Sequence, residues 1–391
     1  RGKGLDGKEG RCRGMHPHGS LQWRCGGGKA KVPRCRSSTK GREEEGGDAL
    51  RLRLRLPRMG TGTWAWGNQL VWGYEEGMDE ELREVFELAV ERTATSGAGA
   101  IFDTGDSYGT GRLNGRSEVL LGDFRKKRRR RRGQGEGAGG DSDGVIIGTK
   151  LATYPWRLTR GSLVRACEAS LKRLQLDRME LVQLHWPAAK YNPLQERALW
   201  EGLGDIHDKG LAQAVGVSNY GPKQLVKIHG YLRERGVPLA TCQVQLSLLS
   251  YGSLQRELLA VCEDLGIHVI AYSPLSLGML TGKYSKGEGN TNTMPRGLRS
   301  LLFGRILPRV QPLTNELEAV ATDLRASPSQ VAIAWCMSKG TIPIPGAKNL
   351  EQARLNFGAL DLELSDQHCQ ALEAAAKRCT ASMTTNVFQT K

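Results

Sequence analysis

Short apolar runs alternate with longer amphipathic stretches along the chain from about residue 50 onwards. Runs that suit strands buried on both faces lie at 60–63, 100–103, 145–149, 180–184, 213–217, 241–245, 267–271 and 341–344. Stretches with apolar residues three and four apart, typical of helices, lie at 79–92, 115–124, 160–174, 196–208, 221–235, 254–265 and 314–339, and helical segments at 328–339, 349–357 and 366–376 finish the fold. Strands that alternate with helices predict parallel β/α units, so we expect a single (β/α)8 TIM barrel over residues 50–391.

Three segments depart from this alternation. The run LRLRLRL at 50–56 has a period of two, which predicts an N-terminal β-hairpin across the bottom of the barrel. Residues 125–144 place eight basic residues and a Gly-rich stretch where links usually take a handful of residues, so we expect a disordered insertion. Residues 1–48 are rich in Gly, Arg and Lys with little apolar periodicity, which predicts a disordered basic leader.

The net charge of +15 comes from these departing segments. Residues 1–58 contribute +10 and residues 125–132 contribute +8, which leaves the rest of the chain slightly acidic. Because the positive charge is confined to these two segments, it does not favour nucleic-acid binding by the globular part of the chain. Arg125–Arg132 is either a solvated loop without a role or a nuclear-localisation or nucleic-acid patch. The leader has the composition of an organelle transit peptide, or it has no targeting role and the protein is cytoplasmic.

Cysteine usage and hydropathy exclude other classes of protein. The nine cysteines form no CxxC pair, and no Cys/His cluster has zinc spacing, so we expect neither a disulfide framework nor a metal site. Scattered thiols fit a reducing compartment. No apolar run reaches the roughly 18 residues that a membrane span needs, so we expect no membrane association.

Polar residues with catalytic chemistry follow several of the expected strands. Asp103 and Tyr108 stand in AIFDTGDSYG, Lys150 in VIIGTK and His185 in ELVQLHWP. In a β/α barrel the carboxyl ends of all strands meet at one face, so these side chains can share one pocket. Each has an ordinary explanation when taken alone: a strand-end cap, a loop aromatic, a snorkelling lysine or a core histidine. Together they are the groups needed to deliver a proton to a carbonyl oxygen.

Six motifs in order, FDTGDSYG, GTK, QLHWP, GVSNY, AYSPL and IPGAKNLEQARLN, resemble the aldo-keto reductase family over residues 57–376. The run GTWAWGNQLVWGY is most similar to the plant and algal chloroplast branch, which indicates the plastid. The resemblance implies NADPH-dependent reduction of a small aldehyde or ketone with Tyr108 as general acid. Lys150, held by Asp103, would lower the pKa of Tyr108, and His185 would orient the substrate oxygen.

The resemblance also implies how NADP(H) is held. Ser218, Asn219 and Gln243 would bind the nicotinamide carboxamide, and Tyr272 would offer a face for stacking. Lys348 and the helix after it would hold the 2′-phosphate, with help from Arg299. The predicted cofactor-binding residues are Gly62, Thr63, Trp64, Asp103, Ser218, Asn219, Gln243, Tyr272, Ser273, Pro274, Leu275, Lys283, Gly346, Lys348, Gln352 and Asn356. The expected aromatic substrate wall draws on Trp64, Trp66, Trp72 and Trp186, and would accept apolar carbonyl compounds, pyridoxal among them.

An alternative within the same fold is an NADPH-binding sensor or accessory subunit with weak or no turnover. Potassium-channel accessory subunits of this superfamily are the precedent for that alternative. The sequence gives no sign of an obligate protein partner, and the intact set of Asp103, Tyr108, Lys150 and His185 favours an enzyme.

Overall fold

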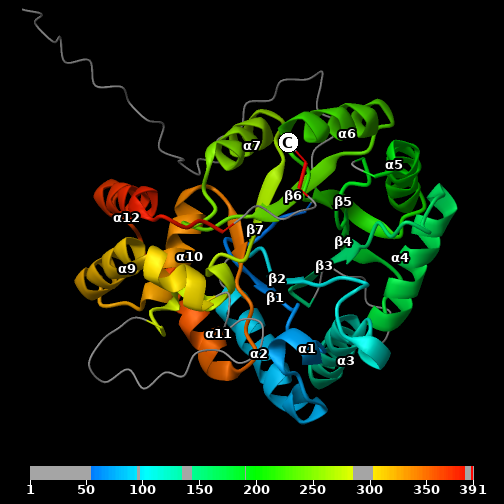
Figure 1. Ribbon diagram of the computed structural model, residues 1–391. Coiled ribbons are helices and arrows are strands. Elements are labelled where there is room, and N and C mark those ends of the chain that lie inside the picture. The colour runs from blue at the N-terminus through cyan, green and yellow to red at the C-terminus, as the bar shows by residue number, and fades with distance from the viewer. Residues whose placement is uncertain are drawn as a thin grey trace, which may run out of the picture. The chain divides into compact units, whose positions relative to one another are not determined.

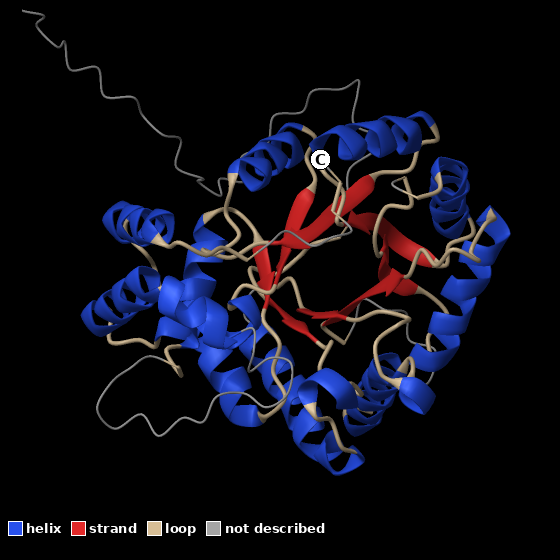
Figure 2. Ribbon diagram, viewed as in Figure 1, coloured by secondary structure: helices blue, strands red, loops and turns tan. Residues whose placement is uncertain are grey.

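The computed structural model describes residues 54–94, 97–133, 143–189, 191–284, 303–383 and 389–390. Eight strands pair in sequence order, each parallel to the next, and helices surround the resulting ring (Figures 1 and 2). The strands are β1 Gly60–Gly62, β2 Ala100–Asp103, β3 Val145–Leu151, β4 Met179–Leu184, β5 Ala212–Ser218, β6 Leu239–Gln245, β7 His268–Tyr272 and β8 Ile342–Ile344. The helices are α1 Gln69–Trp72, α2 Asp79–Thr93, α3 Arg116–Arg131, α4 Arg160–Leu174, α5 Pro193–Asp208, α6 Pro222–Glu234, α7 Ser253–Asp264, α9 Gln311–Asp323, α10 Pro328–Ser338, α11 Leu350–Phe357 and α12 Asp366–Arg378. The predicted (β/α)8 barrel is confirmed.

The ring closes between its first and last strands. Gly62 forms a parallel bridge with Gly346, and its amide donates to the Pro345 carbonyl at 3.1 Å. A Cβ on Gly62 would stand 2.8 Å from the Ile344 carbonyl oxygen, so closure at this point requires glycine.

Two apolar layers hold the barrel together. Inside the ring, strands β2 to β7 each contribute one residue and β8 contributes two to a plug of Ile101, Ile146, Leu181, Ala214, Ala240, Ile270, Ile342 and Ile344. Outside it, the apolar faces of the helices pack on the opposite faces of the strands. Leu54 belongs to the inner plug and Leu56 packs against it.

The predicted N-terminal hairpin is wrong for the part of the segment that the structure describes. Residues 54–59 contain no strand, and residues 50–53 lie outside the described residues. Of the leucines in the period-two pattern, Leu54 and Leu56 lie in the described part, and both contact the plug from chain that forms no strand.

The basic insertion expected at 125–144 is also wrong in its first part. Helix α3 continues through Arg131, and Arg125 is only 1% exposed. Its guanidinium donates to Asp143 at 2.7 and 3.0 Å and to Glu180 at 2.8 Å. Buried acidic partners on neighbouring segments therefore hold the first residue of the charge run inside the fold. Residues 134–142, like the leader 1–48, lie outside the described residues.

The long helical stretch predicted at 314–339 is two helices. Between α9 and α10, Arg325 has a φ of 51°, and Ser327 begins α10 with a capping box to Gln330 ahead of Pro328. A left-handed residue, a side-chain cap and a proline in the first turn end one helix and begin the next.

Candidate active site

The four predicted catalytic residues meet at the carboxyl ends of the strands. Asp103 ends β2, Lys150 lies near the end of β3, His185 directly follows β4, and Tyr108 lies in the loop after β2. All four line one cavity of about 670 Å³. The barrel therefore brings together residues that are up to 82 positions apart, counting from Asp103 to His185.

Lys150 is the most enclosed of the four, with 1% of its surface exposed. Its Nζ donates to Asp103 Oδ1 at 2.5 Å and to the Thr104 carbonyl at 2.6 Å. Gln243 Nε2 donates to the same Asp103 oxygen at 2.6 Å. Burial lowers the pKa of Lys150, and the Asp103 carboxylate acts in the opposite direction. The expected Lys150–Asp103 salt bridge is present.

Tyr108 and His185 are partly buried and lie beside each other on the lining of the cavity. The Lys150 Nζ lies 4.8 Å from the centre of the Tyr108 ring, and the Tyr108 and His185 ring centres are 5.9 Å apart. His185 Nδ1 lies 3.4 Å from the Ser107 hydroxyl. Burial, with a smaller effect of Lys150, holds the pKa of His185 well below its usual value, so the imidazole is neutral.

The expected lowering of the Tyr108 pKa is wrong for this structure. Burial, followed by the charge of Asp103 and then by Tyr272, raises the pKa of Tyr108 well above its usual value. The Lys150 ammonium directs its hydrogen bonds to Asp103 and Thr104 and not to the phenol, and the net shift of the Tyr108 pKa is upward. Tyr108 is therefore a neutral phenol at physiological pH.

The predicted cofactor-binding residues line the same cavity with one exception. Thr63 is fully buried behind the cavity wall, where its amide and its hydroxyl both donate to the Asp103 carbonyl, at 3.0 and 2.8 Å. Alternation along the chain turns Gly62 and Thr63 to opposite sides, so only Gly62 reaches the cavity. Thr63 ties the end of β1 to the end of β2. Arg299 lies outside the described residues.

Asn219 and Tyr272 line the cavity and form a hydrogen-bonded shelf. Asn219 has a φ of 64°, and its Nδ2 donates to the His185 carbonyl at 3.0 Å and to Ser218 Oγ at 3.2 Å. The Tyr272 hydroxyl donates to Asn219 Oδ1 at 2.9 Å. The end of β7 and the loops after β4 and β5 are thereby tied together at the point where the cofactor ring was predicted.

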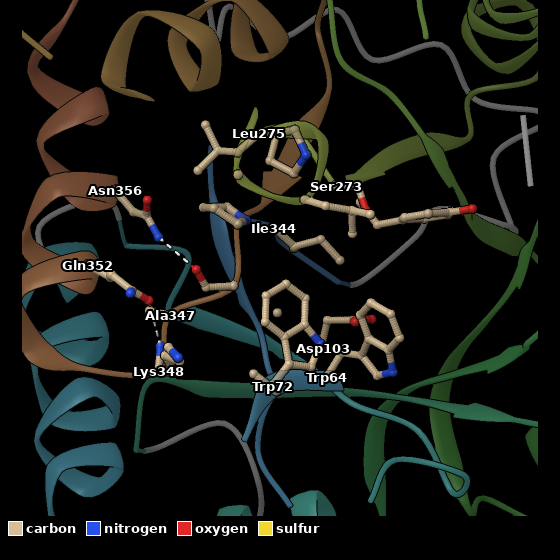
Figure 3. Close-up of a pocket in the computed structure, with 18 of the residues that line it drawn as sticks. Trp64, Trp72, Asp103, Ser273, Leu275, Ile344, Ala347, Lys348, Gln352 and Asn356 are labelled. Atoms are coloured by element: carbon tan, nitrogen blue, oxygen red, sulfur yellow. Dashed lines mark hydrogen bonds between the residues drawn. The ribbon is translucent and has the colours of Figure 1, made fainter. Parts of the chain in front are cut away.

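One end of the cavity is built by the start of α11 (Figure 3). Lys348 precedes the N-cap residue Asn349, and its amide donates to Gln352 Oε1 at 3.1 Å. Asn356, one turn further along α11, donates to the Gly346 carbonyl at 3.2 Å. A lysine beside a helix N-terminus is a suitable place for a phosphate group.

Tryptophans build the other end, where Trp64 and Trp72 lie together in Figure 3. Their ring centres are 5.6 Å apart in an edge-to-face arrangement, and Trp186 also lines the cavity. Trp66 does not belong to this wall. It is fully buried, and its indole N–H donates to the Ala347 carbonyl at 2.9 Å, so it packs in the core.

Sequence reasoning missed several lining residues. Ser327 and Ser329, at the start of α10, border the cavity, as do Thr281, Tyr284, Glu351 and Leu355. Ser327 stands in the pattern SPSQ, which signals a helix start, but the pattern gives no sign that this start faces the cavity. Ser107 stands within the DTGDSYG motif, and its position beside Tyr108 is the signal that could have identified it.

Across the described residues, none of the helices combines the length and apolar character needed to cross a membrane. Within the same residues, no cluster of three His, Cys, Asp or Glu side chains is placed to hold a metal ion.

A cavity that gathers polar side chains at the carboxyl ends of eight parallel strands is the arrangement of a (β/α)8-barrel enzyme. The chain belongs to the aldo/keto reductase family, whose model matches residues 58–377, and it is an oxidoreductase. It is 52% identical over 338 residues to a protein named chloroplastic pyridoxal reductase from Arabidopsis thaliana, a match that covers 86% of this chain and 88% of the relative.

Solved structures agree on the fold. A thermostable aldo-keto reductase in complex with the inhibitor epalrestat superimposes with a TM-score of 0.60 and 25% identity, covering 82% of this chain and 95% of the other. An aldo/keto reductase from Klebsiella pneumoniae, in complex with NADP and acetate, has a TM-score of 0.60 and 21% identity, covering 85% and 95%.

Proposed function

We propose that this protein uses NADPH to reduce an aldehyde or ketone to an alcohol, and that an aromatic aldehyde such as pyridoxal is its substrate. The observation that carries the proposal is the meeting of Tyr108, Lys150, Asp103 and His185 at one cavity, beside nearly all of the predicted cofactor residues. The name of the Arabidopsis relative supports pyridoxal as the first substrate to test.

The residues of the cavity fit NADPH in size and in chemistry. A cavity of about 670 Å³ lies within the range of cofactor sites. Lys348 and the N-terminus of α11 would hold the 2′-phosphate, Lys283 would lie by the pyrophosphate, and Tyr272 would support the nicotinamide. When bound, NADPH supplies the hydride for carbonyl reduction.

Tyr108 would donate the proton that the carbonyl oxygen needs as negative charge builds on it. Its raised pKa supports this role, because the phenol keeps its proton at neutral pH until the reaction draws it away. The Lys150 ammonium, 4.8 Å from the ring centre, would stabilise the charge that then remains on Tyr108. Asp103 and the Thr104 carbonyl would keep that ammonium in place.

His185 would orient the carbonyl oxygen by a hydrogen bond from its neutral ring. Burial holds its pKa low, so it does not compete with Tyr108 as a charged acid. The tryptophan wall would exclude water and stack on an aromatic substrate.

The test is NADPH consumption by the purified protein across a panel of aldehydes and ketones that includes pyridoxal. We expect reduction of aromatic aldehydes, with NADPH preferred over NADH. Tight NADPH binding without reduction of any member of the panel would overturn the enzymatic proposal and favour the sensor alternative.

The proposal extends to the plastid as the site of action. Its support is the basic composition of residues 1–48 and the chloroplastic name of the Arabidopsis relative. Residues 1–58 fused to a fluorescent protein should enter plastids of plant or algal cells, and a fusion that stays in the cytosol would contradict this part.

A further inference from the structure

A buried carboxylate outside the cavity holds two of its loops. Glu196 lies in the first turns of α5 and is 4% exposed. It accepts hydrogen bonds from five donors, which come from the loop after β4, from α5 itself, from the loop after β5 and from α6: Ala188 N, Ala189 N (3.0 Å), Trp200 Nε1 (2.9 Å), Tyr220 Oη (2.6 Å) and Gln224 Nε2 (3.1 Å).

The donor set explains why a carboxylate stands at this position. Two of the partners are backbone N–H groups and one is an indole N–H, and none of these can accept a hydrogen bond. A carboxylate offers acceptors on both oxygens and no donor, so it satisfies all five partners at once. A glutamine of the same shape would set its NH₂ group against an N–H whichever way it turned.

The two loops that Glu196 holds carry cavity residues. Ala188 and Ala189 are separated from His185 and Trp186 only by Pro187, and Tyr220 directly follows Asn219. Asn219 Nδ2 also donates to the His185 carbonyl at 3.0 Å, which joins the two loops on the cavity side. Glu196 joins them from behind, so the distance between the predicted nicotinamide shelf and the substrate wall is fixed at two points.

We propose that Glu196 is a positioning residue that sets the placement of His185 and Trp186 relative to Ser218 and Asn219. This inference rests on the proposed function, since it assigns those residues to substrate and cofactor. Glu196 itself touches neither. Its effect comes from preorganisation: loops held in the reactive geometry need no rearrangement when the ligands bind, and a displacement of about 1 Å can cost up to 100-fold in rate.

The test compares Glu196→Gln with Glu180→Gln. Glu180 is an equally buried carboxylate, also 4% exposed, at the opposite end of the barrel, where it accepts from Arg125 and from the Ile147 amide. For each variant we measure the melting temperature, the NADPH dissociation constant by fluorescence titration, and kcat and KM. Both variants should melt lower than the parent. Glu196→Gln alone should weaken NADPH binding and lower kcat, each by about tenfold or more.

Two results would overturn the inference. One is parental NADPH affinity and kcat in a folded Glu196→Gln protein; the other is an equal kinetic loss in Glu180→Gln, which would mark a general effect of instability. If Glu196→Gln does not fold, Tyr220→Phe removes one neutral donor and should still weaken NADPH binding severalfold, and unchanged binding would then refute the proposal.

The NADPH dissociation constant separates this inference from the proposed function. A parent protein that binds NADPH but reduces no carbonyl compound would overturn the proposed function, while the comparison of dissociation constants would still decide the role of Glu196. A parent protein that binds no NADPH would overturn both.

Discussion

Two buried cations lie at opposite ends of the barrel: Lys150 at its mouth, where the strands end, and Arg125 at its base, where they begin. They are equally buried but differ in the number of carboxylates that bind them. Each is 1% exposed. Arg125 lies between two carboxylates, Asp143 and Glu180, and also donates to the Val145 carbonyl. Lys150 has one carboxylate, Asp103, and a carbonyl, and it borders the cavity.

The consequence appears in the proton affinity of the two groups. Burial alone would lower the pKa of Arg125, but Glu180 and Asp143 raise it above its usual value. Burial lowers the pKa of Lys150, and Asp103 does not restore it. Arg125, with two carboxylate partners, is fixed as part of the fold, whereas Lys150 has a single carboxylate partner and borders the cavity, where it can interact with an incoming group.

The largest expected effect is at the mouth. Tyr108→Phe removes the proposed acid and leaves the ring, so carbonyl reduction should fall about 10²- to 10⁴-fold while the NADPH dissociation constant stays at the parental value. Steady-state kinetics and a fluorescence titration check the two halves of this prediction. Turnover at the parental rate would show that another group supplies the proton.

The next effect is at the base and concerns stability. Arg125→Met leaves Asp143 and Glu180 buried without their shared cation, which should cost about 3–5 kcal/mol in the free energy of unfolding. Urea denaturation measures this cost. Arg131→Met is the matched control, since that side chain is 62% exposed and its loss should change stability by no more than about 0.5 kcal/mol.

In the Arg125→Met protein that remains folded, kcat should equal that of the parent. A clear loss of kcat would contradict the separation of a stabilising base from a catalytic mouth, because it would mean that a change at Arg125 alters the geometry of the cavity.

The sequence predicted the strands well because each is a compact apolar run that needs only local information. It predicted that Asp103, Tyr108, Lys150 and His185 share one cavity because barrel topology alone places strand ends together. Arg125 was misjudged because its partners, Asp143 and Glu180, stand 18 and 55 positions away and only tertiary structure reveals them. A charged run is read as exposed unless acidic residues elsewhere are known to face it.

Within the site, the wrong predictions concern residues whose side chains point in another direction than expected. Thr63 and Trp66 stand in the same motif region as Gly62 and Trp64, but they point into the core. The pKa of Tyr108 was misjudged because the direction of the Lys150 hydrogen bonds cannot be known from spacing. Chemistry-bearing residue types could be predicted, and the balance of burial against charge could not.

A smaller effect is expected for two further cations that line the cavity, Lys348 and Lys283, and it concerns cofactor binding. Lys348→Ala should raise the NADPH dissociation constant about tenfold or more and leave NADH unchanged, since a charge-assisted hydrogen bond contributes about 1.5–3 kcal/mol. Lys283→Ala is the matched control: a cation beside the pyrophosphate should weaken both cofactors alike. Equal losses for NADPH and NADH in Lys348→Ala would contradict a contact with the 2′-phosphate.

The smallest expected effect concerns the free energy of unfolding at acid pH, which a buried neutral histidine at the mouth of the barrel should lower. The pKa of His185 lies well below its usual 6.5, first because of burial and second because of Lys150. Below about pH 6.5 His185 is therefore protonated in the unfolded chain but not in the folded protein. The free energy of unfolding falls as the pH falls, by about 1.4 kcal/mol per pH unit from this group. His185→Asn removes the titrating ring. Urea denaturation at pH 6.5 and 5.5 should show a smaller loss in the variant than in the parent, by about 1 kcal/mol. An equal loss in both proteins would mean that His185 titrates normally, and that the mouth of the barrel is more open to water than its geometry indicates.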